Sequence, residues 1–236
     1  MNRVPPLRPG KSALVSGDYS FGKSTLVKAW VISMGRGAIW AATPVPGEPV
    51  EYSDFAVVVR SAREMERAAK TAPFVVWPCP DPILGVDEMR RQFDEFSRVA
   101  LTFYRAAVVY DEIHRVLGDS KRLIDAPLHF QSMVETGHKK GREFAKVYIA
   151  HRQAQIPLVL AGGAYRVAFK PLPGDEKAID TAFGRGTFAR MMATFEQGDF
   201  AFWSQETGTL MPCRLDLTRR PHATLASRPP LKGGNE

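Results

Sequence analysis

Short apolar runs alternate with amphipathic segments along most of the chain. The apolar runs lie at positions 12–16, 38–42, 55–59, 74–77, 106–111, 146–150 and 165–169. Continuous apolar runs of this length are typical of strands that are buried on both faces of a parallel sheet. The pattern therefore predicts a sheet whose strands are mostly covered by other elements.

The segments between these runs have helical features. Ser61 is a good N-cap and Glu64 stands at the capping-box position, so a helix is predicted over 61–69. In a second segment, 87–104, one helical face is apolar and consists of Met89, Phe93, Phe96, Val99 and Ala100. Further helices are predicted over 25–34, 127–136, 176–183 and 188–195.

The order of these elements predicts the fold class. Strands that alternate with helices indicate an α/β domain with a central, mainly parallel sheet flanked by helices. Two further runs, 200–203 and 211–217, flank a Glu206-Thr207-Gly208 turn and predict an antiparallel edge hairpin near the C-terminus. We expect one domain over 10–218, and a flexible basic tail rich in Pro and Gly over 219–236.

A complete phosphate-binding loop, G-x-x-x-x-G-K-S, follows the first predicted strand. Its residues are Gly17, Asp18, Tyr19, Ser20, Phe21, Gly22, Lys23 and Ser24, and Thr25 follows in the predicted helix. Glycines let backbone N–H groups wrap a phosphate, and the helix adds its positive N-terminal end. Lys23 can reach the β- and γ-phosphates, and the Ser24 hydroxyl can ligate Mg²⁺. The strand–loop–helix context predicts binding of ATP or a related nucleotide.

A pair of acids ends the apolar run 106–111. Asp111 would lie at the carboxyl end of a buried strand, near the phosphate loop, and hold Mg²⁺. Glu112 would then polarise the attacking water as general base. Two acids near Mg²⁺ and a triphosphate indicate hydrolysis of the nucleotide rather than its storage.

The order of motifs resembles the HerA/FtsK superfamily of RecA-like motor ATPases over about residues 12–217. Asp111-Glu112-Ile113-His114-Arg115 resembles the D-E-x-H-R/K form of the Walker B motif in HerA-like proteins. A basic segment, 138–142, then precedes a strand that ends in His151-Arg152-Gln153. Within the superfamily, the short chain looks most like the genome-packaging ATPases of membrane-containing icosahedral viruses.

This resemblance implies roles for further residues. Gln153 would sense the γ-phosphate, and Arg152 competes with it because the family usually has Gln before Arg at this place. The neighbouring subunit of a ring would supply an arginine, for which Arg142 is the first candidate and Arg166 the second. Lys139 and Lys140 would follow DNA phosphates without reading the base sequence.

The resemblance also implies partners. Packaging ATPases of this kind form homo-oligomeric rings, usually hexamers, that drive double-stranded DNA into a preformed capsid. A capsid or membrane-vertex protein would dock the ring. A net charge of +7 agrees with a polyanionic partner but is a weak signal alone.

Composition narrows the setting. We find no signal peptide and no apolar stretch of about 18 residues, the length a membrane helix needs. We therefore expect a protein of the host-cell cytoplasm or the virion, with Cys79 and Cys213 reduced.

Three alternatives stay open at the level of the sequence. The first is another DNA-translocating or secretion ATPase of the HerA/FtsK type. The second, a small-molecule kinase, fits the Asp111-Glu112 pair poorly. The third is a nucleotide-binding regulatory or structural protein with little turnover, and Glu112 counts against it.

Overall fold

A computed structural model gives the fold of the chain. The structure describes residues 5–18, 20–44, 46–117, 122–136, 143–155, 160, 163–190 and 192–217. Several predicted features lie outside these residues: Tyr19, the basic segment 138–142 with Lys139, Lys140 and Arg142, and the tail 219–236.

The described residues form one nine-stranded sheet in the order β3-β4-β2-β5-β6-β1-β7-β8-β9. The strands are β1 (Ser12–Ser16), β2 (Gly37–Ala41), β3 (Val57–Val58), β4 (Phe74–Pro78), β5 (Ala107–Tyr110), β6 (Ala145–Ile149), β7 (Tyr165–Phe169), β8 (Asp199–Ser204) and β9 (Leu210–Arg214). The pairs from β3 to β7 are parallel, and β8 and β9 add an antiparallel hairpin. The predicted α/β fold with an antiparallel edge near the C-terminus is therefore confirmed.

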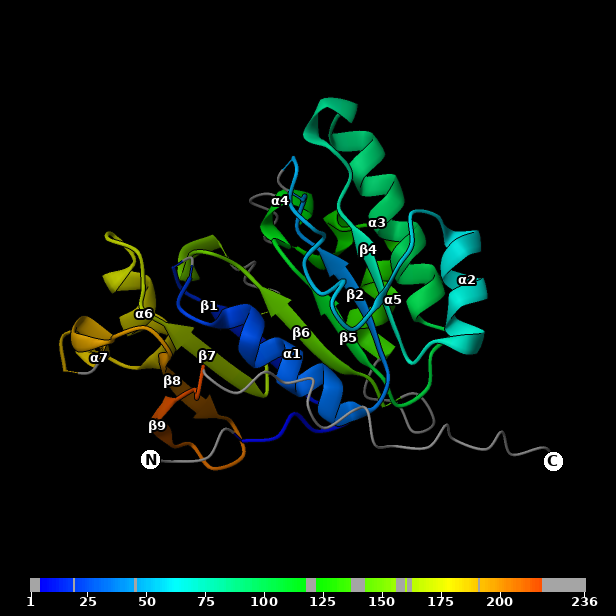
Figure 1. Ribbon diagram of the computed structural model, residues 1–236. Helices are drawn as coiled ribbons and strands as arrows, with labels where there is room; N and C mark the ends of the chain where they lie inside the picture. The colour runs from blue at the N-terminus through cyan, green and yellow to red at the C-terminus, as the bar shows by residue number, and fades with distance from the viewer. Residues whose placement is uncertain are drawn as a thin grey trace.

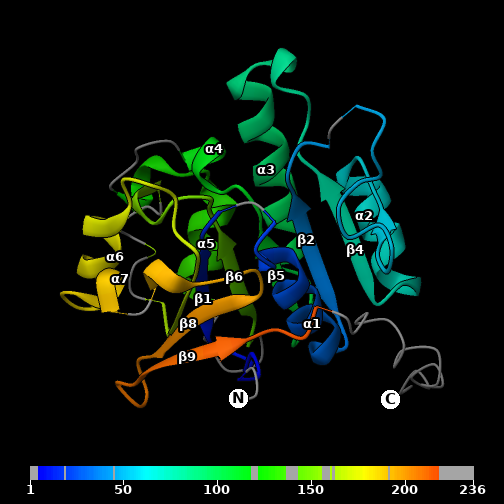
Figure 2. The ribbon, with the colours of Figure 1, turned by 60° about the vertical axis from the view of Figure 1, so that its left-hand side comes forward.

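Helices cover both faces of this sheet (Figure 1). They are α1 (Lys23–Met34), α2 (Ala62–Thr71), α3 (Val86–Ala100), α4 (His114–Leu117), α5 (Leu128–Thr136), α6 (Glu176–Phe183) and α7 (Thr187–Arg190), with 3₁₀ turns at Pro82–Leu84, Leu123–Asp125, Gln153–Gln155 and Met192–Thr194. Helix α1 packs on one face, while α2, α3 and α5 pack on the other. Helices α6 and α7 lie at the β7–β8 end of the sheet (Figure 2).

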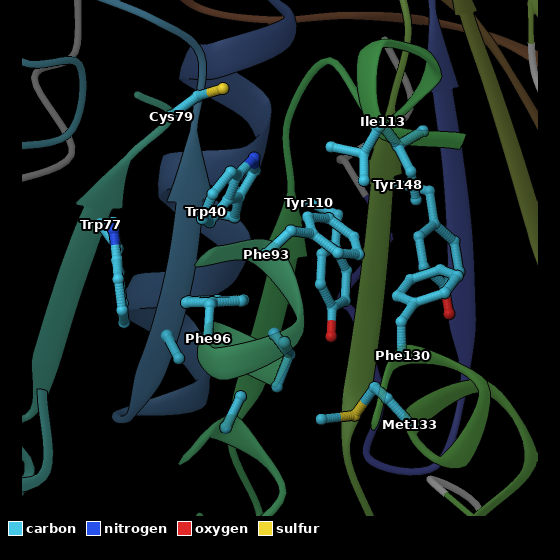
Figure 3. Close-up of a cluster of buried hydrophobic side chains, with 14 of the residues drawn as sticks. Trp40, Trp77, Cys79, Phe93, Phe96, Tyr110, Ile113, Phe130, Met133 and Tyr148 are labelled. Carbon is cyan, nitrogen blue, oxygen red and sulfur yellow. The ribbon is translucent and has the colours of Figure 1, made fainter. Parts of the chain in front are cut away.

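The core on the α3 and α5 face is built from aromatic rings (Figure 3). Tyr110 of β5 stacks on Tyr148 of β6 at 5.7 Å between ring centroids, and Phe130 of α5 meets the Tyr110 ring edge-on at 5.0 Å. On β2, Trp40 meets Phe93 of α3 edge-on at 5.3 Å. This layer packs α3 and α5 against the sheet, and Tyr110 directly precedes the first predicted acid, Asp111.

Local signals placed most helix and strand boundaries well. The Ser61 side chain accepts the N–H of Glu64, as the capping prediction requires, and α2 begins at the next residue. The predicted apolar face of α3 is buried throughout. Cys79 and Cys213 are both buried and free.

Four predicted elements are shorter in the structure. Helix α3 ends at Ala100 rather than at 104, β9 ends at Arg214 rather than at 217, and two other elements differ more. The run 55–59 forms only the two-residue strand β3, with Val57 48% exposed, because β3 is an edge strand at the end of the sheet. The predicted helix 188–195 is replaced by the single turn of α7 and the 3₁₀ turn at Met192–Thr194. No helix in the described ranges combines the length and apolar character that a bilayer span requires.

Candidate active site

The phosphate loop connects β1 directly to α1. Gly17 and Gly22 have φ angles of 131° and 107°, in the region that favours glycine. A Cβ at Gly17 would lie 2.7 Å from Cβ of Phe169, so the close approach of β7 requires glycine there as well. Helix α1 begins at Lys23, and its N-terminal N–H groups therefore point toward the loop.

Lys23 lies inside this loop and is 7% exposed. Its ammonium donates to the carbonyl oxygens of Gly17 at 2.8 Å and Asp18 at 2.6 Å. Burial lowers the pKa of Lys23, although the nearby carboxylates of Asp111 and Asp18 oppose this shift. The loop thus holds a cation beside its own backbone, where a phosphate would bind.

The C-terminal part of the domain closes the outer side of the loop. The Gln197 side-chain amide donates to the carbonyl of Ser20 at 2.9 Å, and the N–H of Gly198 donates to that of Phe21 at 3.2 Å. Leu217 follows β9 and lines the same cavity as Lys23. The antiparallel hairpin therefore helps to hold the phosphate loop.

Asp111 and Glu112 follow β5 at the same edge of the sheet. Strand β6 lies between β5 and β1, so the acids and the phosphate loop face each other across the end of β6. One cavity of about 840 Å³ is lined by both groups, including Lys23, Ser24, Asp111 and Glu112. The topology thus brings together the residues that the sequence assigned to phosphate binding, Mg²⁺ binding and hydrolysis.

The Asp111 carboxylate is buried and fixed through both oxygens. Oδ1 accepts the N–H of Glu112 at 2.9 Å, and Oδ2 accepts the hydroxyl of Tyr52 at 3.3 Å. Burial raises the pKa of Asp111, and the nearby charges of Glu51 and Glu112 add to this effect. The Ser24 side chain lies close enough to the Tyr52 hydroxyl to lower its pKa against the raising effect of burial, so the two predicted Mg²⁺ ligands share one neighbour.

Glu112 adopts a strained backbone conformation, with φ at 49°. Its Oε1 accepts a hydrogen bond from Nε2 of His151 at 2.7 Å, and its Oε2 pairs with Nε of Arg115 at 2.8 Å. Burial opposes ionisation of Glu112, but the His151 hydrogen bond and the Arg115 charge outweigh it and lower the pKa. Glu112 is therefore a carboxylate at neutral pH.

The ring of His114 packs edge-on against that of His151, with 6.1 Å between the ring centroids.

The two candidates for the γ-phosphate sensor, Gln153 and Arg152, follow β6 and have different surroundings. Gln153 Oε1 accepts the hydroxyl of Ser16, the last residue of β1, at 2.7 Å. Arg152 is exposed; burial raises the pKa of Asp175, and the Arg152 charge opposes this shift. The buried Asp175 carboxylate accepts the backbone N–H of Gln153 at 3.2 Å. This geometry ties Gln153 rather than Arg152 to the start of the phosphate loop.

Arg166, the second candidate for an arginine acting between subunits, is engaged within its own chain. Its guanidinium lies 4.5 Å from the ring centroid of Trp203 and donates to the carbonyl of Ala182. The role of Arg166 stays a prediction, and the first candidate, Arg142, lies outside the described residues.

The sequence reasoning missed four residues at this site: Tyr52, Arg115, His151 and Asp175. His151 and Arg115 were visible as parts of the two polar motifs, but nothing indicated that both would contact Glu112. Tyr52 carried no signal, because it lies in a turn 59 positions before the carboxylate that it contacts.

Comparisons with known proteins agree with this architecture. The genome-packaging NTPase B204 of Sulfolobus turreted icosahedral virus 2, solved with AMPPCP, matches with a TM-score of 0.64 and 13% identity over 86% of this chain and 97% of that chain. VirB4 of Thermoanaerobacter pseudethanolicus matches with a TM-score of 0.63 and 11% identity over 87% and 89%. No protein-family model and no curated protein matches the sequence.

A third solved structure covers a smaller part of its own chain. The cytoplasmic domain of the type VII secretion ATPase EccC of Thermomonospora curvata matches 86% of this chain and 25% of that chain, with a TM-score of 0.55 and 11% identity. These matches confirm the fold that the resemblance to HerA/FtsK-type ATPases implied.

Proposed function

We propose that the protein is a Mg²⁺-dependent ATPase that moves double-stranded DNA, and that it packages a viral genome into a preformed capsid. The observation that carries this proposal is the single cavity lined by Lys23 and Ser24 on one side and by Asp111 and Glu112 on the other. The similar fold of B204, a genome-packaging NTPase solved with ATP analogues, supports the choice of cargo.

The oxygens of Ser24 and Asp111 fit a magnesium ion. Mg²⁺ prefers hydroxyl, carboxylate and phosphate oxygens, and in nucleotide sites it uses one or two protein ligands. Among the described residues no group of three or more His, Cys, Asp or Glu side chains forms a metal site of its own. Two ligands completed by substrate phosphates therefore suit this donor set. When bound, Mg²⁺ would neutralise charge on the β- and γ-phosphates.

The remaining residues act on the phosphates and on water. The loop N–H groups would bind the β- and γ-phosphates. The Lys23 ammonium would exchange its hydrogen bonds to the Gly17 and Asp18 carbonyls for contacts with the same phosphates. Glu112, an ionised carboxylate at the cavity wall, would orient water for in-line attack. Gln153, tied to Ser16, would respond to the γ-phosphate and transmit its loss to the end of β6.

Translocation requires more than one subunit in this proposal. The protein would form a homo-oligomeric ring, a hexamer, in which Arg142 or Arg166 completes the site of the next subunit. Basic side chains, Lys139 and Lys140 among them, would contact DNA phosphates in the pore. The ring would act in the host cytoplasm or on the virion, docked to a capsid or membrane-vertex protein.

A second candidate function is secretion or another translocation by a HerA/FtsK-type motor. The equally good fold match to VirB4 and the match to EccC favour it. The two functions share ATP hydrolysis and differ in cargo. Double-stranded DNA as an activator therefore separates them.

The test is steady-state ATP turnover of the purified chain with and without double-stranded DNA. We expect turnover to rise severalfold with DNA. The variant Glu112→Gln should lose about 100-fold or more of this turnover and still bind nucleotide, because the base is lost while the phosphate loop remains. Glu95→Gln is the matched control, since Glu95 is an exposed helix carboxylate paired with Arg91.

Each result decides a different part of the proposal. Turnover that ignores DNA would contradict the DNA motor and favour another cargo. Bound nucleotide without turnover in the wild type would favour a regulatory protein. Full activity in Glu112→Gln would remove Glu112 from the mechanism.

A further inference from the structure

Tyr52 occupies an unusual place for a tyrosine. It lies in the turn between β2 and β3, is 1% exposed, and has a left-handed backbone with φ at 70°. Its carbonyl accepts the N–H groups of Phe55 at 3.2 Å and Ala56 at 3.0 Å. This conformation is strained for a bulky residue, so tertiary contacts must hold it.

Those contacts fix the phenol ring from two sides. The ring meets Phe55 edge-on at 6.3 Å between centroids, and the Lys28 ammonium of α1 lies 5.6 Å from its centroid. Lys28 also pairs with Asp54 at 3.2 Å. The turn and the phosphate-loop helix therefore hold the ring together, and its hydroxyl has little freedom of position.

The hydroxyl has neighbours on two separate elements. It donates to Asp111, which follows β5, at 3.3 Å, and the Ser24 side chain on α1 lies close enough to lower its pKa. Strand β6 separates β5 from the strand that leads into α1. One immobilised oxygen thus hydrogen-bonds one of the two residues that the proposed function assigns to Mg²⁺ and lies near the other.

We infer that Tyr52 is a positioning residue for the metal site, an inference that rests on the proposed function. Tyr52 sets the separation of the Ser24 hydroxyl and the Asp111 carboxylate, so that both are presented to one ion. Mg²⁺ demands near-ideal octahedral geometry, which makes its affinity sensitive to this separation. Loss of an outer partner of a metal ligand typically lowers metal affinity 10–100-fold.

The test is the Mg²⁺ dependence of ADP binding, measured by titration calorimetry for the wild type and Tyr52→Phe. This variant keeps the ring and its packing and removes only the hydroxyl. We expect the Mg²⁺ concentration that gives half of the affinity gain to rise about 10-fold. Affinity for ADP in EDTA should stay at the wild-type value, because the phosphate loop is unchanged.

Tyr148→Phe is the matched control. Tyr148 is also a fully buried tyrosine, but its hydroxyl lies in the aromatic core and has no hydrogen-bond partner among the described residues. Its removal should leave the Mg²⁺ dependence of ADP binding unchanged.

The outcomes separate this inference from the proposed function. An unchanged Mg²⁺ requirement in Tyr52→Phe would overturn the inference, as would an equal loss of ADP affinity with and without Mg²⁺. Wild-type ADP binding that ignores Mg²⁺ would also overturn it, even if ATP were hydrolysed. A wild type that binds Mg²⁺ and ADP without hydrolysing ATP would contradict the ATPase alone, and Tyr52→Phe would still decide the role of Tyr52.

Discussion

Lys23 and Lys146 are buried to a similar degree, with 7% and 6% of each residue exposed. They lie at opposite ends of two neighbouring parallel strands. Lys23 follows the carboxyl end of β1, whereas Lys146 is the second residue of the neighbouring parallel strand β6. Burial lowers the pKa of both ammonium groups, to about 8 for Lys146. By burial and pKa direction alone, the two regions look equally suited to chemistry.

Their surroundings differ. The Lys146 ammonium donates to the carbonyls of Val134 at 2.8 Å and Met133 at 3.4 Å, in the last turns of α5, where a cation stabilises the helix end. Lys23 faces a cavity, with the carboxylates of Asp111 and Asp18 nearby. The comparison teaches that a depressed pKa marks burial, while a cavity and opposite charges mark a site.

The largest expected difference comes from the same substitution at both positions. Lys23→Met should lower ATP turnover by about 100-fold or more, because a charged partner of the phosphates is lost. Lys146→Met should keep a turnover close to that of the wild type. Steady-state kinetics, with circular dichroism to verify folding, would measure both. An equal loss in the two variants would break the comparison.

A smaller effect is expected from the carboxylate that supports Gln153. Asp175→Ala removes the acceptor for the N–H of Gln153. We expect ATP turnover to fall about 10-fold, since a 1.4 kcal/mol loss of transition-state stabilisation has this effect. Asp175→Asn, which keeps one acceptor oxygen, should recover part of the rate.

Asp180→Ala provides the control for Asp175. Asp180 likewise accepts backbone N–H groups, those of Gly186 and Phe188, but at the start of α7. Both alanine variants should lose about 1 kcal/mol of unfolding free energy. Only Asp175→Ala should lose turnover, and similar kinetics in the two variants would contradict the positioning role of Asp175.

The smallest effect concerns pH. The pKa of Lys146 is about 8 in the folded chain, below its ordinary value of 10.5, so above pH 8 the unfolded chain binds more protons at this position. The unfolding free energy should therefore gain from Lys146 as the pH rises from about 8 toward 10, by up to about 1.4 kcal/mol per unit. Denaturant unfolding at several pH values from 7 to 9.5 measures the unfolding free energy as a function of pH. This free energy should rise less steeply with pH in Lys146→Met than in the wild type. An equal rise in both would mean that Lys146 keeps its proton in the folded chain.

The fold could be predicted from local patterns. Apolar runs marked the strands, and a capping residue or an apolar face marked helices such as α2 and α3, because each signal lies within one element. Edge elements were less predictable. Strand β3 and helix α7 are shorter than their sequences predict. Their lengths depend on tertiary neighbours, which a short stretch of sequence does not reveal.

The sequence by itself determined the phosphate loop, because all its residues are contiguous and one backbone path serves them. It also placed Asp111 and Glu112 at the end of a buried strand. Only the tertiary structure decided what these residues touch. His151 and Tyr52 reach Glu112 and Asp111 across 39 and 59 positions of sequence. Such contacts depend on strand order and on how loops cross the sheet edge, and both are set by packing of the whole domain.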